Sequence, residues 1–465
     1  MPDDTHTLIP ITDIENQLYE KRQKIYPREV HGLFARLRVT AALFLLGLFY
    51  SIPWFNWAIE DGARQAVLFD LPARKFHIFW LTFWPQDFIY LTMMLILAAL
   101  SLFFFTTLAG RLWCGYACPQ TVWTETFLWI ERVVEGSRSQ QIRLDRHKRS
   151  RHTLTRKTLK HVLWIAFSLW TGFTFVGYFT PIRELAAAAL EWSVSGWSLF
   201  WILFYAFATY GNAGWMREQV CLYMCPYARF QSAMFDKNTL IISYDETRGE
   251  PRAKGKKRAS TTGDCIDCSL CVQACPTGID IRDGLQYECI GCAACIDACD
   301  DVMEKIKQPR GLIRYTTENA LLGTPTRIIR PRVIIYAAVL LGLFALLIWS
   351  VNQRVLVDID VIRDRNVLYR ELDDGIISNS YTLKILNKTE QTQTYLISVS
   401  GIEDLQLVVD STELRVGPGA VLEVPVQLTT GIQKLSKKTH DIVFHIKAER
   451  SPALSNTTPS RFFGP

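Results

Sequence analysis

The feature that most constrains the fold of this 465-residue chain is the alternation of long apolar blocks with strongly charged stretches. A helix that crosses a bilayer needs about 20 apolar residues. Five stretches reach that length: roughly 39–58, 87–109, 161–180, 195–213 and 332–351. The pattern predicts five transmembrane helices, with more than one folding unit in the rest of the chain.

Lys and Arg are unevenly distributed around these stretches. Arg36 and Arg38 precede the first stretch. Between the second and third stretches lie Arg143, Arg146, Lys148, Arg149 and Arg151. Between the fourth and fifth lie Lys254, Lys256, Lys257 and Arg258. The positive-inside rule then predicts a cytoplasmic N-terminus and an outward C-terminal tail. The aromatic stretch 76–85 is short and ends in proline, so an interfacial or re-entrant segment is favoured over a sixth span. A sixth span would place the C-terminal tail on the other side of the membrane.

Charge and cysteine placement exclude other classes of protein. The net charge of +6 sits in loops that flank apolar blocks, which favours contact with membrane lipid and argues against nucleic acid. The polar N-terminal segment 1–38 shows no removable signal peptide. All twelve cysteines lie between Cys114 and Cys299, which argues against a disulfide framework and places them where thiols stay reduced.

Eight of the cysteines form two successive runs with the same spacing. The first is Cys265-x2-Cys268-x2-Cys271-x3-Cys275-Pro276 and the second is Cys289-x2-Cys292-x2-Cys295-x3-Cys299. In bacterial two-cluster ferredoxins, three close cysteines bind one 4Fe-4S cluster and the fourth binds the other. This predicts cluster 1 on Cys265, Cys268, Cys271 and Cys299, and cluster 2 on Cys275, Cys289, Cys292 and Cys295.

Zinc is a poor alternative, because structural zinc sites commonly use two separated Cys-x2-Cys pairs. One departure is Asp300, which follows Cys299 where proline is expected. Paired clusters pass single electrons, so electron transfer is the predicted function of this module. No Gly-x-Gly-x-x-Gly fingerprint follows a strand, so the electrons are expected to come from an unidentified partner or a membrane carrier.

The other four cysteines form two Cys-x3-Cys-Pro units, Cys114 with Cys118 and Cys221 with Cys225, which follow the second and fourth spans. Proline suits the first position of a helix, so Cys118 and Cys225 are predicted to be N-caps, where a thiol has a lowered pKa. Four soft sulfurs are ligands for Cu(I), zinc or another cluster. The alternative is that these are small buried residues at helix junctions. Whether both pairs share one site stays open.

From about residue 355 the apolar pattern changes to a period of two, with turn signals such as Gly417-Pro418-Gly419. About seven short strands in roughly 100 residues predict an immunoglobulin-like β-sandwich. Pro425 suggests an edge strand. This tail has no cysteine and no cluster of metal-type ligands, so a structural or partner-binding role is favoured.

Four strings together resemble a known family. They are the paired cluster motif, Trp-Cys-Gly-Tyr-Ala-Cys-Pro-Gln-Thr-Val-Trp-Thr-Glu at 113–125, Cys-Leu-Tyr-Met-Cys-Pro-Tyr-Ala-Arg-Phe-Gln at 221–231 and Arg-Tyr-Thr-Thr-Glu-Asn at 314–319. They look like the cytochrome c oxidase accessory protein family CcoG, also called FixG or RdxA. The resemblance covers almost the whole chain.

That family is associated with assembly of the C-family haem–copper oxidase, alongside copper-transporting partners, and is thought to reduce Cu(II) to Cu(I). The resemblance thus implies an oxidoreductase of the bacterial inner membrane, in which Cys114, Cys118, Cys221 and Cys225 are the candidate copper site. It also implies partners among oxidase assembly factors and a copper transporter. Two alternatives remain: a quinol-linked electron conduit to a respiratory reductase, and a non-enzymatic scaffold or redox sensor.

The expected organisation is an α-helical membrane protein with a two-cluster, ferredoxin-like cytoplasmic module and a periplasmic immunoglobulin-like β-sandwich. Its parts are a cytoplasmic segment (1–38), a four-helix membrane region with both Cys-x3-Cys-Pro units (39–247), the ferredoxin-like domain with its basic linker (248–331), a fifth transmembrane helix (332–351) and the β-sandwich (352–465).

Overall fold

The computed structural model describes residues 24–59, 62–147, 150–252, 262–364, 367–372, 375–389, 391–411, 413–449 and 454–465. The chain divides into two compact units, which are described separately. Unit 1 contains Met1–Tyr50, Ala99–Val176 and Ser195–Ala338, and unit 2 contains Ser51–Ala98, Gly177–Val194 and Val339–Pro465. The predicted basic residues Lys148, Arg149, Lys254, Lys256, Lys257 and Arg258 lie outside the described residues.

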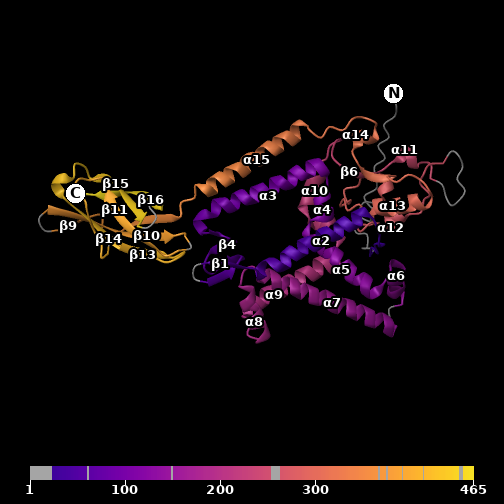
Figure 1. Cartoon of the computed structure of the whole chain (residues 1–465), viewed down its shortest axis with the longest axis horizontal. Coiled ribbons are helices and arrows are strands. Elements are labelled where there is room, and N and C mark those ends of the chain that lie inside the picture. The colour runs from indigo at the N-terminus through magenta and orange to yellow at the C-terminus, as the bar shows by residue number, and fades with distance from the viewer. Residues whose placement is uncertain are drawn as a thin grey trace, which may run out of the picture. The chain divides into compact units, whose positions relative to one another are not determined.

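Four helices among the described residues are long and apolar enough to cross a membrane. They are Leu33–Trp54, made of α2 (Leu33–Ser51) and a final 3-10 turn (Ile52–Trp54), then α3 (Phe88–Ala109), α7 (Arg151–Val176) and α15 (Pro331–Asn352) (Figure 1). The low burial of their apolar side chains inside the protein suits contact with lipid.

The stretch predicted as the fourth span, 195–213, differs from the other four. Its α-helix, α9 (Gly196–Thr209), has 14 residues, and the chain continues directly into π-helical turns at Tyr210–Met216. A Cβ on Gly172 of α7 would meet the Ile202 carbonyl oxygen at 2.4 Å, so this glycine allows α7 and α9 to approach closely. The predicted length is therefore reached only by combining two kinds of helix.

The remaining helices are short. They are α4 (Leu112–Tyr116), α5 (Pro119–Glu135), α6 (Arg138–Arg146), α8 (Ile182–Leu190), α10 (Pro226–Ala233), α11 (Glu246–Gly249), α12 (Leu270–Ala274), α13 (Ala294–Lys305) and α14 (Glu318–Leu321). On α5, buried Glu131 accepts hydrogen bonds from Arg217 at 2.8 Å, Lys160 at 3.2 Å and Lys24 at 3.3 Å. This charge network joins three distant parts of unit 1.

The segment 76–85 is not a membrane helix. It contains β4 (Lys75–Ile78) and β5 (Leu81–Phe83), which join β3 (Val67–Asp70) in an antiparallel sheet of three strands. A separate hairpin pairs β1 (Asn56–Ile59) with β2 (Gly62–Gln65).

The part of unit 1 from β6 (Ile241–Tyr244) to β7 (Ile313–Thr316) is called the cluster module here. The two strands pair antiparallel, and α12 and α13 pack on them around an apolar core that includes Ile281, Met303 and Leu312. The predicted cluster cysteines lie between the two strands in sequence.

The cluster module also holds the start of the first membrane helix. Asp297 of α13 accepts hydrogen bonds from the backbone N–H groups of Phe34 at 3.2 Å and Ala35 at 2.6 Å. A Cβ on Gly32 would lie 2.2 Å from the Asp297 carboxylate, so only glycine permits this approach. A carboxylate at this position satisfies N–H groups that have no partner within their own helix.

The C-terminal β-domain, residues 357–465, consists of two antiparallel sheets. One has the order β12-β14-β10-β8, with β9 also pairing to β10, and the other has the order β13-β11-β15-β16. The strands are β8 (Val357–Arg363), β9 (Arg370–Leu372), β10 (Ile376–Asn387), β11 (Gln393–Ser400), β12 (Gln406–Val408), β13 (Glu413–Val416), β14 (Val421–Gly431), β15 (Thr439–Ala448) and β16 (Ser455–Phe463).

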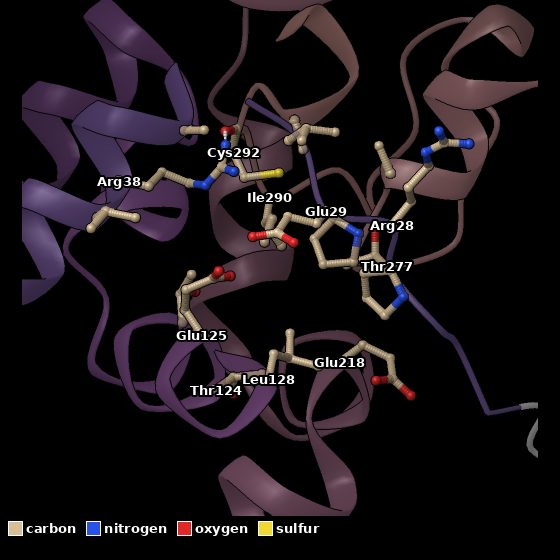
Figure 2. Close-up of a pocket in the computed structure, with 18 of the residues that line it drawn as sticks. Arg28, Glu29, Arg38, Thr124, Glu125, Leu128, Glu218, Thr277, Ile290 and Cys292 are labelled. Carbon is tan, nitrogen blue, oxygen red and sulfur yellow. Dashed lines mark hydrogen bonds between the residues drawn. The ribbon is translucent and has the colours of Figure 1, made fainter. Parts of the chain in front are cut away.

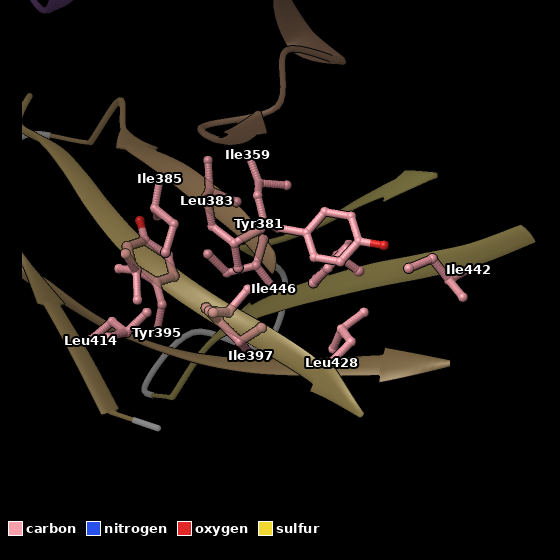
Figure 3. Packing of buried hydrophobic residues seen from close by; sticks show 14 of the residues in the cluster. Ile359, Tyr381, Leu383, Ile385, Tyr395, Ile397, Leu414, Leu428, Ile442 and Ile446 are labelled. Atoms are coloured by element: carbon pink, nitrogen blue, oxygen red, sulfur yellow. The ribbon is translucent and has the colours of Figure 1, made fainter. Parts of the chain in front are cut away.

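Side chains from both sheets form one apolar core, which includes Tyr395 (Figure 3). Tyr395, Phe444 and Phe462 are fully buried in it. β14 lies between two strands, which differs from the edge strand suggested by Pro425. However, β12 pairs only with residues 427–429 of β14, so Pro425 has a ladder partner only on the β10 side. The missing N–H of proline is tolerated there.

Candidate metal centres

The four thiols predicted for cluster 1 surround one small cavity in the cluster module. Cys265, Cys268, Cys271 and Cys299 line it together with apolar residues such as Met303 and Leu312. Cys271 comes from α12 and Cys299 from α13, which brings the third cysteine of the first run and the last cysteine of the second run to the same place. This lining is compatible with the predicted crossed arrangement of two-cluster ferredoxins.

A second cavity contains the thiols predicted for cluster 2. Cys275, Cys289, Cys292 and Cys295 line it, with Cys271 and four isoleucines in the wall. The two cavities share Cys271 and belong to one small core. Groups held in them would be near neighbours.

The backbone around the two cavities repeats the same unusual turn. Asp267 and Ser269 flank Cys268 with φ of 50° and 55°, and Gly291 and Ala293 flank Cys292 with φ of 70° and 59°. Alternation of left-handed and right-handed residues points successive backbone N–H groups into a concave surface, which is an arrangement found at iron–sulfur sites. This strained backbone at equivalent positions fits the binding of an anionic cluster by each motif.

The spacing of the thiols fits a cluster better than a single ion. Among the described residues, no group of three or more His, Cys, Asp or Glu side chains is arranged to hold one metal ion. Four cysteines line each of the two cavities, and the repeated 2-2-3 spacing of their motifs is typical of 4Fe-4S clusters, whereas structural zinc sites commonly use two separated Cys-x2-Cys pairs.

Burial strongly affects these thiols when they carry no metal. It raises the pKa of Cys271 to about 11, although Arg282 opposes the effect, and the pKa of Cys299 to about 12. The pKa of Cys292 also rises to about 12 because of burial, against the attraction of Arg38. Metal must bind thiolates, so assembly of the clusters releases protons.

The two Cys-x3-Cys-Pro units adopt the predicted helix starts. Cys118 is the N-cap of α5 and Cys225 is the N-cap of α10, and each is followed by proline at the first helical position. Cys221 lies in the π-helical segment Val220–Met224. Such segments are rare and often mark functional sites.

The structure brings the two units together. The charges of Cys118, Cys221 and Cys225 each act on Cys114, which places the four thiols in one neighbourhood. The prediction of lowered pKa values is wrong for Cys118: burial raises its pKa, and this outweighs hydrogen bonds from the backbone of Thr121 and Gln120. Burial also raises the pKa of Cys114 and of Cys221 to about 12.

The four-thiol neighbourhood touches the backbone of the second cavity. A Cβ on Gly115 would lie 2.7 Å from the Gly291 carbonyl oxygen and 2.9 Å from the Cys292 Cα, so the turn after Cys114 packs directly on the Cys292 loop. Tyr315 donates a hydrogen bond to the Gly291 carbonyl at 2.7 Å and holds the same loop.

Three residues that the sequence reasoning did not single out connect these sites. Buried Arg111 donates to the carbonyl oxygens of Cys289 at 3.1 Å and Ala228 at 2.7 Å. Arg38 donates to the Cys292 carbonyl, and Tyr315 holds Gly291. The only sequence signal was their proximity to motifs: Arg111 precedes Cys114 by three positions, and Tyr315 lies in the 314–319 string.

Comparison with known proteins agrees with this geometry. The profile of a 4Fe-4S dicluster domain matches residues 216–318, that of a 4Fe-4S binding domain matches 90–135, and that of the IG-like fold at the C-terminal of FixG matches 347–465. The nitrogen fixation protein FixG of Rhizobium meliloti (strain 1021) is 38% identical over 430 residues, covering 84% of this chain and 81% of FixG. Protein RdxB of Cereibacter sphaeroides is 41% identical over 429 residues, covering 89% and 88%. The chain belongs to the FixG/RdxA family.

More distant similarity extends to other membrane ferredoxins. The ferredoxin-type protein NapH of Escherichia coli (strain K12) is 23% identical over 259 residues, covering 51% of this chain and 85% of NapH. A crystal structure of a FixG-related protein from Vibrio parahaemolyticus is 33% identical and covers 23% of this chain and 95% of that chain, with a TM-score of 0.21. Family, apolar helices and cysteine cavities together make this FixG/RdxA-family chain a membrane iron–sulfur protein that transfers electrons.

Proposed function

We propose that this protein reduces Cu(II) to Cu(I) one electron at a time and serves assembly of a C-family haem–copper cytochrome c oxidase. The observation that carries the proposal is the packing of the Cys114–Gly115 turn on the Cys292 loop. It supports a path from the second cavity to four soft sulfur ligands without any moving carrier.

Two groups of cysteines have different proposed roles, one in electron relay and one in copper reduction. The eight cysteines of the cluster module would hold the two 4Fe-4S clusters, which supply one electron at a time when bound. Cys114, Cys118, Cys221 and Cys225 would receive copper. Thiolates favour Cu(I) over Cu(II), so they stabilise the product of the reduction.

The lack of a preformed site for a single ion among the described residues is compatible with this role. Copper is the substrate here, and a site from which the ion must leave does not need a rigid ligand cage. Burial raises the pKa values of Cys114, Cys118 and Cys221, so these three thiols stay neutral until copper displaces their protons.

The proposed location is the bacterial inner membrane. The cluster module and the four thiols would face the cytoplasm, where thiols stay reduced, and the C-terminal β-domain would face the periplasm. Oxidase assembly factors and a copper transporter are the proposed partners, in agreement with the family resemblance.

The test is low-temperature EPR of anaerobically purified protein, reduced with dithionite and freed of excess reductant, before and after two equivalents of Cu(II), one for each electron that two reduced clusters hold. We expect the reduced-cluster signals to disappear together with the cupric signal. In a Cys114→Ser/Cys118→Ser variant, the cluster signals should persist beside unreduced Cu(II). Thr126→Ser is a matched control on α5, away from the thiols. Equal reduction by all three proteins would refute the assignment of the copper site, and no reduction by the wild type would refute the activity.

A further inference from the structure

A large cavity in unit 1 has Cys221 and Cys292 of the sites above in its lining, and the rest of its lining has no role in the copper proposal. It has a volume of about 560 Å³ and lies among the segment before α2, the first turns of α2, the first half of α5 and the Cys292 loop (Figure 2). This volume is in the range of small-molecule sites, roughly 300 to 1,000 Å³, and far exceeds the space that a metal ion needs.

The position of the cavity links a membrane-level entrance to an electron acceptor. Val39 and Thr40 of the first membrane helix form part of its wall, and Val39 is 50% exposed on the protein surface. The lining also includes Cys292 and Ile290 of the second cluster motif. A ligand dissolved in lipid can therefore approach from α2 and lie against a predicted cluster ligand.

Acidic and apolar side chains share the lining. Figure 2 shows the carboxylates of Glu29 and Glu125 projecting into the same space, with Leu128 and Ile290 beside them. Glu125 is held by Arg132 at 2.9 Å. The carboxylates of Glu29 and Glu125 are therefore placed where they can accept protons from a bound neutral molecule.

The charges of the cavity lining nearly balance. The lining has five arginines and three glutamates: Arg28, Arg36, Arg38, Arg132 and Arg217, and Glu29, Glu125 and Glu218. Arg132 pairs with Glu125, Arg217 pairs with buried Glu131 at 2.8 Å, and Arg38 donates to the Cys292 carbonyl. Because carboxylates offset most of the arginine charge, the lining suits a neutral ligand.

Positive charge is instead directed at the Cys289 and Cys292 backbone. Arg38 and Arg111 donate to the carbonyl oxygens of these two cluster-motif cysteines. A neighbouring cation stabilises a group that gains negative charge, which favours acceptance of an electron from a mild donor.

We propose that this cavity binds the headgroup of a membrane quinol, which is the electron donor of the protein. Oxidation of one quinol yields quinone, two electrons and two protons. The electrons match the capacity of two one-electron clusters, and Glu29 and Glu125 take the protons. This inference rests on the electron-transfer function and is independent of copper as the final acceptor.

The first test measures binding on the full-length protein in nanodiscs, with decylubiquinone as the probe. Saturable binding is expected, and an azido-quinone should label residues 25–40 or 120–132. Thr124→Trp would fill the cavity and lower the affinity at least tenfold. Val133→Trp is the matched control, because Val133 lies on the same helix and is 62% exposed. Equal binding by both variants, or no saturable binding by the wild type, would overturn the proposal.

The second test measures reduction of the clusters by decylubiquinol under anaerobic conditions. Glu29→Gln should keep quinone binding but slow cluster reduction at least tenfold, while the EPR signals after dithionite stay unchanged. Reduction by NADH that is lost in Thr124→Trp would assign the cavity to a soluble dinucleotide and contradict the proposal. Dithionite supplies electrons without a quinol, and Glu29 is not one of the copper thiols, so persistence of dithionite-driven Cu(II) reduction in Glu29→Gln separates failure of this inference from failure of the copper proposal.

Discussion

The cluster module and the C-terminal β-domain fill their interiors with different kinds of group. The β-domain has one continuous apolar core under long antiparallel ladders, including eleven paired positions between β10 and β14. The cluster module has a two-stranded sheet, a five-residue α12 and a core whose members include Cys265 and Cys271. We therefore expect the β-domain to be stable without any bound group, and the module to depend on the groups that its cysteines bind.

Removal of iron should produce the largest difference in stability between the two regions. We expect anaerobic chelation to unfold the module, because the eight thiols of the two motifs then lose their shared partners, while the β-domain keeps its structure. Hydrogen exchange on the full-length protein measures both regions in one sample. Increased exchange across α13 with unchanged exchange in β10 and β15 is the expected result. Equal exchange in α13 with and without iron would show that the module folds without clusters.

A substitution in the core of the β-domain tests the same comparison from the other region. Phe444→Ala should lower the free energy of unfolding of that domain by about 3 to 5 kcal/mol, because it removes a fully buried aromatic side chain. The cluster EPR signals should stay unchanged. Val408→Ala is the control, since Val408 is 52% exposed, and it should have little effect. Loss of cluster signals in Phe444→Ala would show that the two regions are energetically coupled.

The charge network on α5 predicts a smaller, pH-dependent effect in unit 1. Burial alone would raise the pKa of Glu131, but Arg217, Lys24 and Lys160 lower it to about 2. The folded pKa is below the ordinary value, so the stabilisation is complete above about pH 4.5 and is lost as the pH falls toward 2.

The size of this effect is on the order of 2 kcal/mol. Hydrogen exchange of α5 between pH 6 and 3 measures it, after correction for the intrinsic exchange rates. The loss should be absent in Glu131→Gln, which has no charge to titrate. A wild type whose corrected exchange does not change with pH would contradict the pKa direction.

The smallest expected effect is on the surface of α13. Lys305 and Asp301 form an exposed ion pair four residues apart, at 2.5 Å. Solvent screens such pairs, so Lys305→Ala should leave the midpoint of thermal unfolding and the cluster signals unchanged within error. A clear destabilisation would mean that the surface of the module contributes more than its cysteine-lined interior suggests.

Local covalent spacing explains why the cluster cavities could be predicted from sequence. The intervals in Cys265-x2-Cys268-x2-Cys271 restrict where three thiols can lie, and the repeated motif predicts the crossed partner. Proline after Cys118 likewise predicts a helix start. The alternating pattern after residue 355 predicts strands because the side-chain period of a strand is two.

Features that depend on packing between distant segments were not predictable. The meeting of Cys114 with Cys221 requires the turn after α3 to pack against the π-helical segment, and no local pattern encodes that contact. The raised pKa of Cys118 has the same origin, because a helix start lowers a thiol pKa only when burial is slight. The link from Arg111 to the Cys289 carbonyl depends on the folded module.

The hydrogen bonds from Phe34 and Ala35 to Asp297 have a consequence for biogenesis. The ribosome makes the first membrane helix more than 260 residues before it makes the carboxylate that completes the start of that helix. Asp297 lies between Cys295 and Cys299, so it reaches its position only when the cysteine loops are in place. Until metal loading brings Asp297 into place, the N–H groups at the start of the helix have no partner, and we expect membrane quality-control proteases to recognise newly inserted chains. Maturation of the cofactor would then also set the lifetime of the protein.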